Sequence, residues 1–129
     1  MIVGVGVDLV EISRLERTLC RRWAKTFVAR VFSEEEISTC RSSPRPAEAF
    51  AARFAAKEAL AKALGTGFSR GITPATIHIQ GTERSRPSIQ LVGAALDVAK
   101  SMNVASIHLS LSHTARSACA MVVLERTTD

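Results

Sequence analysis

The sequence predicts an α+β fold in which an antiparallel sheet packs against a long central helix. Strong helix formers fill residues 48–64 without Gly or Pro, and apolar side chains surround most of that helix. Residues 106–113 alternate strictly in polarity, and residues 117–125 form a nearly continuous apolar run, a combination typical of paired strands. Helical patterns concentrate in the first half of the chain and strand patterns in the second, which favours α+β over alternating α/β units.

The amino-acid composition indicates which classes of protein this chain can belong to. The 129 residues are 47% hydrophobic, which predicts one domain over residues 1–129. The chain has no run of about 18 apolar residues and no charged segment before an apolar one at its start, so we expect neither a membrane span nor secretion. Cys20, Cys40 and Cys119 are widely spaced and match no zinc or disulfide pattern, which favours a reducing cytoplasm. The net charge of +5 favours an anionic partner.

The first element is a strand over residues 2–9, which we expect to join the sheet. One of its faces carries only Gly4, Gly6 and Asp8. Glycines in a strand indicate close approach of another element or a bound group, and Asp8 would lie beside it. A dinucleotide-binding motif is excluded because no third glycine follows in phase. A turn-capping role for Asp8 is the equally weighted alternative.

Ser13 and Glu16 form a capping-box pattern, and the helix is predicted to run from Ser13 to about residue 30. Its core stripe is Leu15, Leu19, Trp23 and Phe27, and a separate row is basic: Arg14, Arg17, Arg21 and Lys25. Like charges at this spacing repel one another, so an acidic binding partner explains the row better than chance does. An ordinary solvated face is the alternative.

Ser33 and Glu36 form a second capping box, which accounts for the local glutamates without any chemistry. Pro46 can open the central helix, and Gly65 is expected to end it in a left-handed conformation. The remaining predicted elements are a hairpin from strands 75–80 and 88–92 joined by a polar turn over 81–87, and an amphipathic helix over 93–102 that stops near Asn103.

The central helix carries two charged pairs at four-residue spacing, Arg53 with Lys57 and Glu58 with Lys62. The ordinary interpretation is that the pairs lie on solvated edges of the helix, where each stabilises it by roughly a few tenths of a kcal/mol. A carboxylate, a lysine one turn later and the loop Gly65-Thr66-Gly67, whose N–H groups can approach an anion, are also typical of a metal-bound phosphate site.

The turn between the last two strands offers further donors. Ser112, His113 and Thr114 can all donate hydrogen bonds to phosphate oxygens, although a turn histidine is more often structural. His78 points away from the core side of its strand, and we expect no role for it.

Three motifs together are distinctive: Gly4-Val5-Gly6-Val7-Asp8; Arg53-Phe54-Ala55-Ala56-Lys57-Glu58-Ala59 with Lys62 and Gly65-Thr66-Gly67; and Leu109-Ser110-Leu111-Ser112-His113-Thr114. With these motifs the chain resembles the holo-acyl-carrier-protein synthases, a family of 4′-phosphopantetheinyl transferases. The resemblance covers essentially the whole length in the same order. It implies Mg²⁺-dependent transfer of phosphopantetheine from coenzyme A to a serine of acyl carrier protein, with release of adenosine 3′,5′-bisphosphate, by a homotrimer with sites between subunits.

The resemblance also implies residue roles. Asp8 and Glu58 match the metal ligands, and Glu58 and Lys62 are the expected catalytic residues, with Lys62 on the pyrophosphate side. The base that takes the serine proton is either Glu58 or a water on the metal. The expected coenzyme-binding residues are Arg45, Arg53, Lys62, Gly65, Thr66, Gly67, Ser112, His113 and Thr114. The expected surface for docking carrier protein is the basic row of Arg14, Arg17, Arg21 and Lys25.

Two positions depart from the family pattern. Pro44-Arg45 stands where the family often has a basic pair, and Pro74-Ala75 stands where it often has an aromatic residue. Arg45 and Arg53 are therefore the candidates for contact with the 3′-phosphate of the coenzyme.

A non-enzymatic module that binds an acidic protein or nucleic acid through the same basic row is the competing hypothesis. The chain has no Tyr, one Trp and five Phe, and the aromatic residues mostly follow core spacing instead of alternating with Lys and Arg, which disfavours nucleic acid. A binding module also gives no reason for Glu58 and Lys62 on a buried helix.

Overall fold

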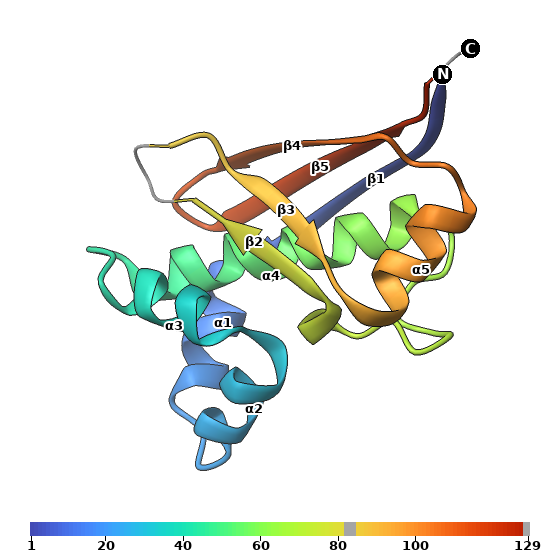
Figure 1. The fold of residues 1–129 in the computed structure, drawn as a ribbon. Helices are drawn as coiled ribbons and strands as arrows, with labels where there is room; N and C mark the ends of the chain where they lie inside the picture. The colour runs from blue at the N-terminus through green and yellow to red at the C-terminus, as the bar shows by residue number, and fades with distance from the viewer. Residues whose placement is uncertain (82–84, 128–129) are drawn as a thin grey trace.

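The structure is a computed structural model that describes residues 1–81 and 85–127 (Figure 1). Its elements are β1 (Ile2–Glu11), α1 (Ile12–Leu19), α2 (Ala24–Val31), α3 (Glu34–Arg41), α4 (Pro46–Ala63), the 3₁₀ turn η1 (Pro74–Thr76), β2 (Ile77–Gln80), β3 (Ser88–Leu91), α5 (Gly93–Ser101), β4 (Ser106–His113) and β5 (Ser117–Glu125). Three strands form an antiparallel sheet in the order β1-β5-β4, and β2 pairs with β3. The predicted α+β class is confirmed.

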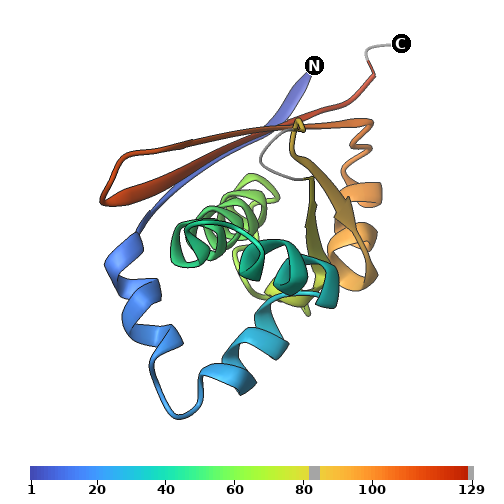
Figure 2. The ribbon, with the colours of Figure 1, turned by 90° about the vertical axis from the view of Figure 1, so that its left-hand side faces the viewer.

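The long helix α4 is the centre of the molecule. Figure 2 looks nearly along it and shows the sheet above, the α1 and α2 segment below, and the β2-β3 hairpin at its side. The inward face of β5 that covers α4 consists of Ala118, Ala120, Val122 and Leu124, all fully buried. Small residues on both surfaces let helix and sheet pack at short distance, so that backbone groups of α4 reach β1 directly.

The predicted single helix after β1 is wrong, because the structure has two short helices joined by a turn at residues 20–23. The capping box at Ser13 is also wrong: α1 begins at Ile12, and its N-cap Glu11 makes no side-chain cap hydrogen bond. The turn redirects the chain so that Phe27 packs on Phe32 and Phe54, with ring centroids 6.4 and 6.3 Å apart. Tertiary packing here overrides local helix preference.

Because of the same turn, Trp23 does not lie in the core stripe, and its exposed fraction is 53%. Arg14 and Arg17 lie on α1, Arg21 lies in the turn, and Lys25 lies on α2. The basic row therefore does not belong to one helix but follows the outside of a bent segment.

Other predicted ends are confirmed. The capping box of Ser33 and Glu36 is complete in both directions, and Pro46 opens α4. Gly65 follows α4 with a φ of 79°, in the left-handed region that favours glycine. The β2-β3 hairpin and α5 match their predictions, while residues 82–84 of the predicted polar turn lie outside the described residues.

The outward face of the sheet exposes apolar side chains. Val5, Val7 and Leu9 on β1 are 53%, 56% and 68% exposed, and Met121 on β5 is 48% exposed. Val7 and Met121 are register partners on adjacent strands, so these side chains form one apolar surface, which we call the outer sheet face. Such a continuous exposed apolar surface is characteristic of a protein contact surface.

Candidate active site

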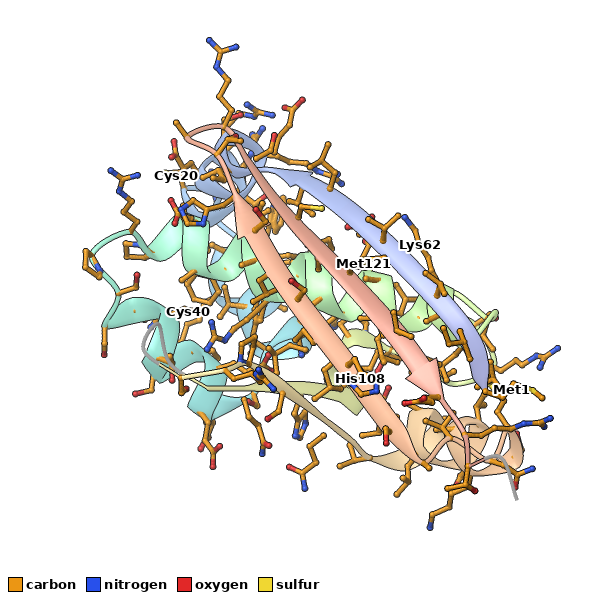
Figure 3. All side chains as sticks on the ribbon, turned by 90° about the horizontal axis from the view of Figure 1, so that it is seen from above. Met1, Cys20, Cys40, Lys62, His108 and Met121 are labelled. Atoms are coloured by element: carbon orange, nitrogen blue, oxygen red, sulfur yellow. The ribbon has the colours of Figure 1, made fainter. Side chains whose placement is uncertain are left out.

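The two acids that sequence reasoning paired come from different elements, Asp8 from β1 and Glu58 from α4. Lys62, one turn after Glu58, donates a hydrogen bond of 2.9 Å to Asp8 Oδ1 and one of 3.1 Å to the Val7 carbonyl. It lies beside β1 at the open edge of the sheet (Figure 3). Asp8 and Glu58 act electrostatically on one another, as do Glu58 and Lys62. The structure thus brings Asp8, Glu58 and Lys62 together, and we call them the acid–lysine cluster.

The glycines of β1 make this meeting possible. A Cβ on Gly4 would lie 2.1 Å from the Ala63 carbonyl oxygen, and one on Gly6 would lie 1.9 Å from that of Ala59. Real Cβ atoms never come so close, so only glycine lets α4 rest on the strand. Asp8 lies two residues beyond Gly6 and therefore on the same face of the strand.

The electrostatics of the cluster favour a bound cation. Partial burial raises the pKa of Glu58, and the neighbouring Asp8 carboxylate raises it further, while Lys62 and Arg14 oppose the rise. The hydrogen bond to Asp8 raises the pKa of Lys62. The oxygens of Asp8 and Val7 already hold an ammonium group, which shows that this donor set accepts a positive charge.

The two carboxylates of the cluster fit Mg²⁺. Within the described ranges, no group of three or more His, Cys, Asp and Glu residues converges, so a closed metal cage of the zinc type is not found there. Two carboxylates are the protein ligands typical of Mg²⁺, which keeps waters and substrate oxygens in its remaining positions. Asp8 and Glu58 would supply those two carboxylates.

A cavity of about 790 Å³ lies on another side of α4, between the start of the helix, the β2-β3 hairpin and the end of β4. Its lining residues are Pro44, Arg45, Glu48, Ala49, Ala52, Arg53, Ile79, Gln80, Gly81, Ser85, Arg86, Pro87, Leu109, Ser110, Leu111, Ser112 and His113. Among the described residues that line the cavity, three carry guanidinium groups and one carries a carboxylate. The balance favours an anionic ligand, and the volume suits one of cofactor size.

Two basic residues of the cavity lie next to one acid. Glu48 Oε2 lies 3.6 Å from Arg45 Nη1, and Glu48 Oε1 lies 3.2 Å from His113 Nε2. Arg53 donates to the Gly81 carbonyl at 2.7 Å, and its buried Nε has no hydrogen-bond partner among the residues that the structure describes. That nitrogen has almost no solvent-accessible surface, and Arg53 also interacts with the buried Cys40 thiol, so Nε itself is not a ligand contact in this conformation. Glu48 and Arg86 were not predicted, because their roles depend on contacts across the fold.

Arg53 and Lys57 do not lie on a solvated edge, and that interpretation is wrong for both. The Lys57 side chain is 0% exposed and lies 2.9 Å from Glu36 Oε1. It also donates to the Pro74 carbonyl at 2.9 Å and to the Ile77 carbonyl. Glu36 Oε2 in turn accepts the Ile79 N–H at 3.3 Å. The capping glutamate therefore also binds a buried lysine 21 positions away.

This buried pair joins α3, α4 and β2, and it influences neighbouring groups. Burial lowers the pKa of Lys57, with Glu36 opposing the shift. Burial raises the pKa of the nearby Cys40 thiol to about 11, which makes it an unreactive core residue.

The glycine loop is largely occupied by the end of α4. Gly65 N–H donates to the Lys62 carbonyl at 2.9 Å, and Gly67 N–H donates to that of Ala61 at 3.1 Å. The Thr66 hydroxyl donates to the Gly67 carbonyl at 2.8 Å. Free phosphate-facing N–H groups at Gly65 and Gly67 therefore require the helix end to rearrange.

The β4-β5 turn lies beside the cavity. His113 ends β4 and lines the cavity with Ser112, whereas Thr114 is not among the lining residues. The Thr114 hydroxyl accepts the N–H groups of Arg116 and Ser117, at 3.2 and 3.1 Å, and so shapes the turn.

Arg53 and Lys62 are nine positions apart on α4, which is about two and a half turns, so they project from opposite sides of the helix. The cavity and the acid–lysine cluster are thus separate surfaces of one chain. Of the basic row, Arg14 acts electrostatically on Glu58 and so adjoins the cluster.

These features define a class: an α+β protein with an acid–lysine cluster on one side of its central helix and a basic cavity on another. A family model described as the 4'-phosphopantetheinyl transferase superfamily matches residues 4–122. A holo-[acyl-carrier-protein] synthase from Desulfovibrio desulfuricans is 46% identical over 125 residues, which cover 97% of this chain and 98% of that protein. The chain belongs to the 4'-phosphopantetheinyl transferase superfamily and is an enzyme of the holo-[acyl-carrier-protein] synthase kind.

Solved structures of holo-[acyl-carrier-protein] synthases have the same fold as this chain. The crystal structure of holo-[acyl-carrier-protein] synthase from Neisseria meningitidis superposes with a TM-score of 0.86 at 31% identity and covers 98% of this chain and 100% of that one. The Helicobacter pylori enzyme, solved in complex with coenzyme A, gives 0.81 at 31% identity, with 94% and 99% covered. Within the described part of this chain, no helix has both the length and the apolarity to cross a membrane.

Proposed function

We propose that this chain, as one domain over residues 1–129, transfers the 4′-phosphopantetheine group from coenzyme A to a serine of apo acyl carrier protein. The reaction depends on Mg²⁺ and releases adenosine 3′,5′-bisphosphate. The observation that carries the proposal is the acid–lysine cluster. In it Lys62 Nζ lies 2.9 Å from Asp8 Oδ1, although the two residues are 54 positions apart in the sequence. Coenzyme A is bound by the Helicobacter pylori relative, which supports it as the donor.

Attack by a serine hydroxyl on the diphosphate builds negative charge on the oxygen that leaves. Asp8 and Glu58 would hold Mg²⁺, which when bound would supply Lewis-acid stabilisation of that charge. The Lys62 ammonium neutralises the leaving group, because its flexible stem lets it reach beyond the cluster. Glu58 or a water accepts the serine proton, a contribution of about 10²–10⁴-fold.

The basic cavity is proposed to take the adenosine 3′-phosphate end of the coenzyme. Arg45 and Arg53, which both line the cavity, supply charge-assisted donors for that phosphate. Ser112 and His113 form the neighbouring wall. We also propose Gly65, Thr66, Gly67 and Thr114 as coenzyme contacts, and for Gly65 and Gly67 this requires the end of α4 to release their N–H groups.

The enzyme is proposed to act as a homotrimer with sites between subunits. Arg53 and Lys62 lie on opposite sides of α4, so one coenzyme reaches both kinds of surface most simply when a second copy supplies one of them. The outer sheet face, with Val7 and Met121 exposed, is the apolar surface available for that contact. Light scattering should give the mass of three chains, and Val7→Lys should shift the protein to the monomer.

Carrier protein is proposed to dock on the bent basic segment of Arg14, Arg17, Arg21 and Lys25, which adjoins the cluster through Arg14. Reversing Arg14 and Arg21 to Glu should raise KM for carrier protein far more than KM for coenzyme A. Since such attraction is screened over about 8 Å at physiological salt, KM for carrier protein should also rise with ionic strength. Equal effects on both substrates would contradict the docking role. The proposed setting is the cytoplasm.

The deciding experiment mixes the protein with coenzyme A, Mg²⁺ and apo carrier protein and measures the mass of the carrier protein. We expect it to gain one phosphopantetheine group, whereas a binding module would leave it unchanged. Glu58→Ala should abolish the gain without loss of the circular dichroism spectrum. Glu35→Gln is the matched control, because Glu35 is an exposed acid in the first turn of α3, outside the cluster. Full activity of Glu58→Ala in Mg²⁺ would refute the metal assignment.

A further inference from the structure

Lys62 occupies a position that its proposed role does not explain. A lysine that neutralises a diphosphate leaving group should point toward the ligand. Instead its ammonium is held by two oxygens of β1, Asp8 Oδ1 at 2.9 Å and the Val7 carbonyl at 3.1 Å. Its principal partner is thus one of the two carboxylates proposed to bind Mg²⁺.

The two cations compete for the same oxygen atoms. An ammonium and Mg²⁺ are both hard cations that take oxygen ligands, and like charges repel strongly at contact distance. Asp8 is the more enclosed partner, with 11% of its side chain exposed against 52% for Lys62. The lysine can therefore leave more easily than the carboxylate can turn away.

We propose that Lys62 is a placeholder cation, which holds Asp8 while no divalent ion is bound and moves to the diphosphate when Mg²⁺ takes Asp8. This inference rests on the proposed function, because the diphosphate belongs to the proposed donor. It makes Lys62 a link between two ligands: Mg²⁺ releases the ammonium that the coenzyme needs, and the coenzyme attracts the ammonium that hinders Mg²⁺. By linkage each ligand then raises the affinity for the other.

The structure supplies an internal contrast that supports an exchangeable lysine. Lys57, on the same helix, has its ammonium enclosed by Glu36 and two backbone carbonyls and is 0% exposed. Lys62 is half-exposed; its ammonium hydrogen-bonds to Asp8 and Val7 of β1, and Glu58 acts on it electrostatically. Exposed ion pairs are weak, so Lys62 can move without disturbing the fold.

The test measures Mg²⁺ binding by calorimetry in the absence of coenzyme. Lys62→Met keeps an unbranched side chain and removes the charge, so Mg²⁺ should bind about fivefold more tightly, equivalent to about 1 kcal/mol. Lys62→Arg keeps the charge and should stay within about twofold of the wild type. Lys100→Met removes a lysine from the last turn of α5 and should leave Mg²⁺ affinity unchanged.

A second measurement tests the link itself. The affinity for coenzyme A is determined with and without Mg²⁺, and the ratio should be smaller in Lys62→Met than in the wild type. Transfer activity is lost in Lys62→Met whether or not the lysine is a placeholder, so activity does not enter this test.

Unchanged or weaker Mg²⁺ binding by Lys62→Met, in a protein whose wild type transfers phosphopantetheine, would overturn the placeholder role and leave the proposed function standing. A wild type that transfers nothing would overturn the proposed function itself. If neither protein binds Mg²⁺, the metal site is wrong, and the placeholder role fails with it.

Discussion

The two lysines of α4 form ammonium–carboxylate pairs of the same length, yet their surroundings are opposite. Lys57 meets Glu36 and Lys62 meets Asp8, both at 2.9 Å. The first pair is 0% and 1% exposed, the second 52% and 11%. Burial lowers the pKa of Lys57, whereas the hydrogen bond to Asp8 raises that of Lys62. The comparison teaches that burial, and not distance, separates an ion pair that holds the fold from one that can exchange partners.

Lys57→Met gives the largest expected effect. It leaves the Glu36 carboxylate buried without its cation, which costs about 3–5 kcal/mol of unfolding free energy. Urea denaturation monitored by circular dichroism measures the loss. The double variant Lys57→Met with Glu36→Leu should recover part of it, because no buried charge then remains unpaired. A loss below about 1 kcal/mol for the single variant would show that the enclosed pair does not hold the fold.

Gly6→Ala has the next largest expected effect. It should disturb the Lys62–Asp8 pair, which includes β1, and leave the Lys57–Glu36 pair in place. The new Cβ meets the Ala59 carbonyl of α4, so helix and strand must move apart, at a cost of about 1–3 kcal/mol. Asp8 shares that strand face, so transfer activity should fall by more than the stability loss alone predicts. Glu35→Ala, at an exposed position of α3 outside the cluster, the cavity and the outer sheet face, is the control substitution. Equal activity in the two variants would contradict the role given to the close approach.

Lys62→Met should cost less than about 1 kcal/mol of stability, as exposed ion pairs do. Measurement at low salt and in 1 M NaCl should show the difference from wild type shrinking, because solvent ions screen exposed charges. The loss in Lys57→Met should persist in high salt, since the buried pair is not reached. A salt-independent loss for Lys62→Met would remove the contrast between the two pairs.

The smallest effect is a difference in alkaline pH dependence. A lysine whose folded pKa is raised contributes stability that is complete below its ordinary pKa of 10.5 and is lost as pH rises through the folded value. For Lys57 the folded pKa is lowered, so between that value and 10.5 stability rises with pH. Thermal melts above pH 9 should therefore show a shallower alkaline decline in Lys62→Met than in wild type. A steeper alkaline loss of stability in Lys62→Met than in wild type would contradict a raised pKa for Lys62.

The sequence predicted those features that local periodicity controls. The central helix, the strands 106–113 and 117–125, and the ends at Ser33 and Gly65 were all readable, because each depends on neighbours within a few positions. The break between α1 and α2 was missed, since residues 20–23 contain no Gly or Pro to signal it. The break accompanies the packing of Phe27 on Phe54, a contact between distant residues that no local rule contains.

The candidate site was predicted by a different route. Asp8 and Glu58 were paired by resemblance to a family, and spacing alone did not bring them together. The glycines of β1 did indicate close approach of another element, which the structure identifies as α4. The capping box fully explains a glutamate at position 36, so the sequence gives no reason to expect its contact with Lys57. When one role already explains a residue, the sequence does not indicate a second role.

The position of Asp8 rests on the parity of a strand. Gly6 and Asp8 face α4 because they are two positions apart, while Val7 between them faces outward. Inserting a single residue between Gly6 and Asp8 would turn the carboxylate to the apolar side and leave every functional side chain chemically unchanged. Length changes in this strand should therefore be as damaging as loss of the acid itself.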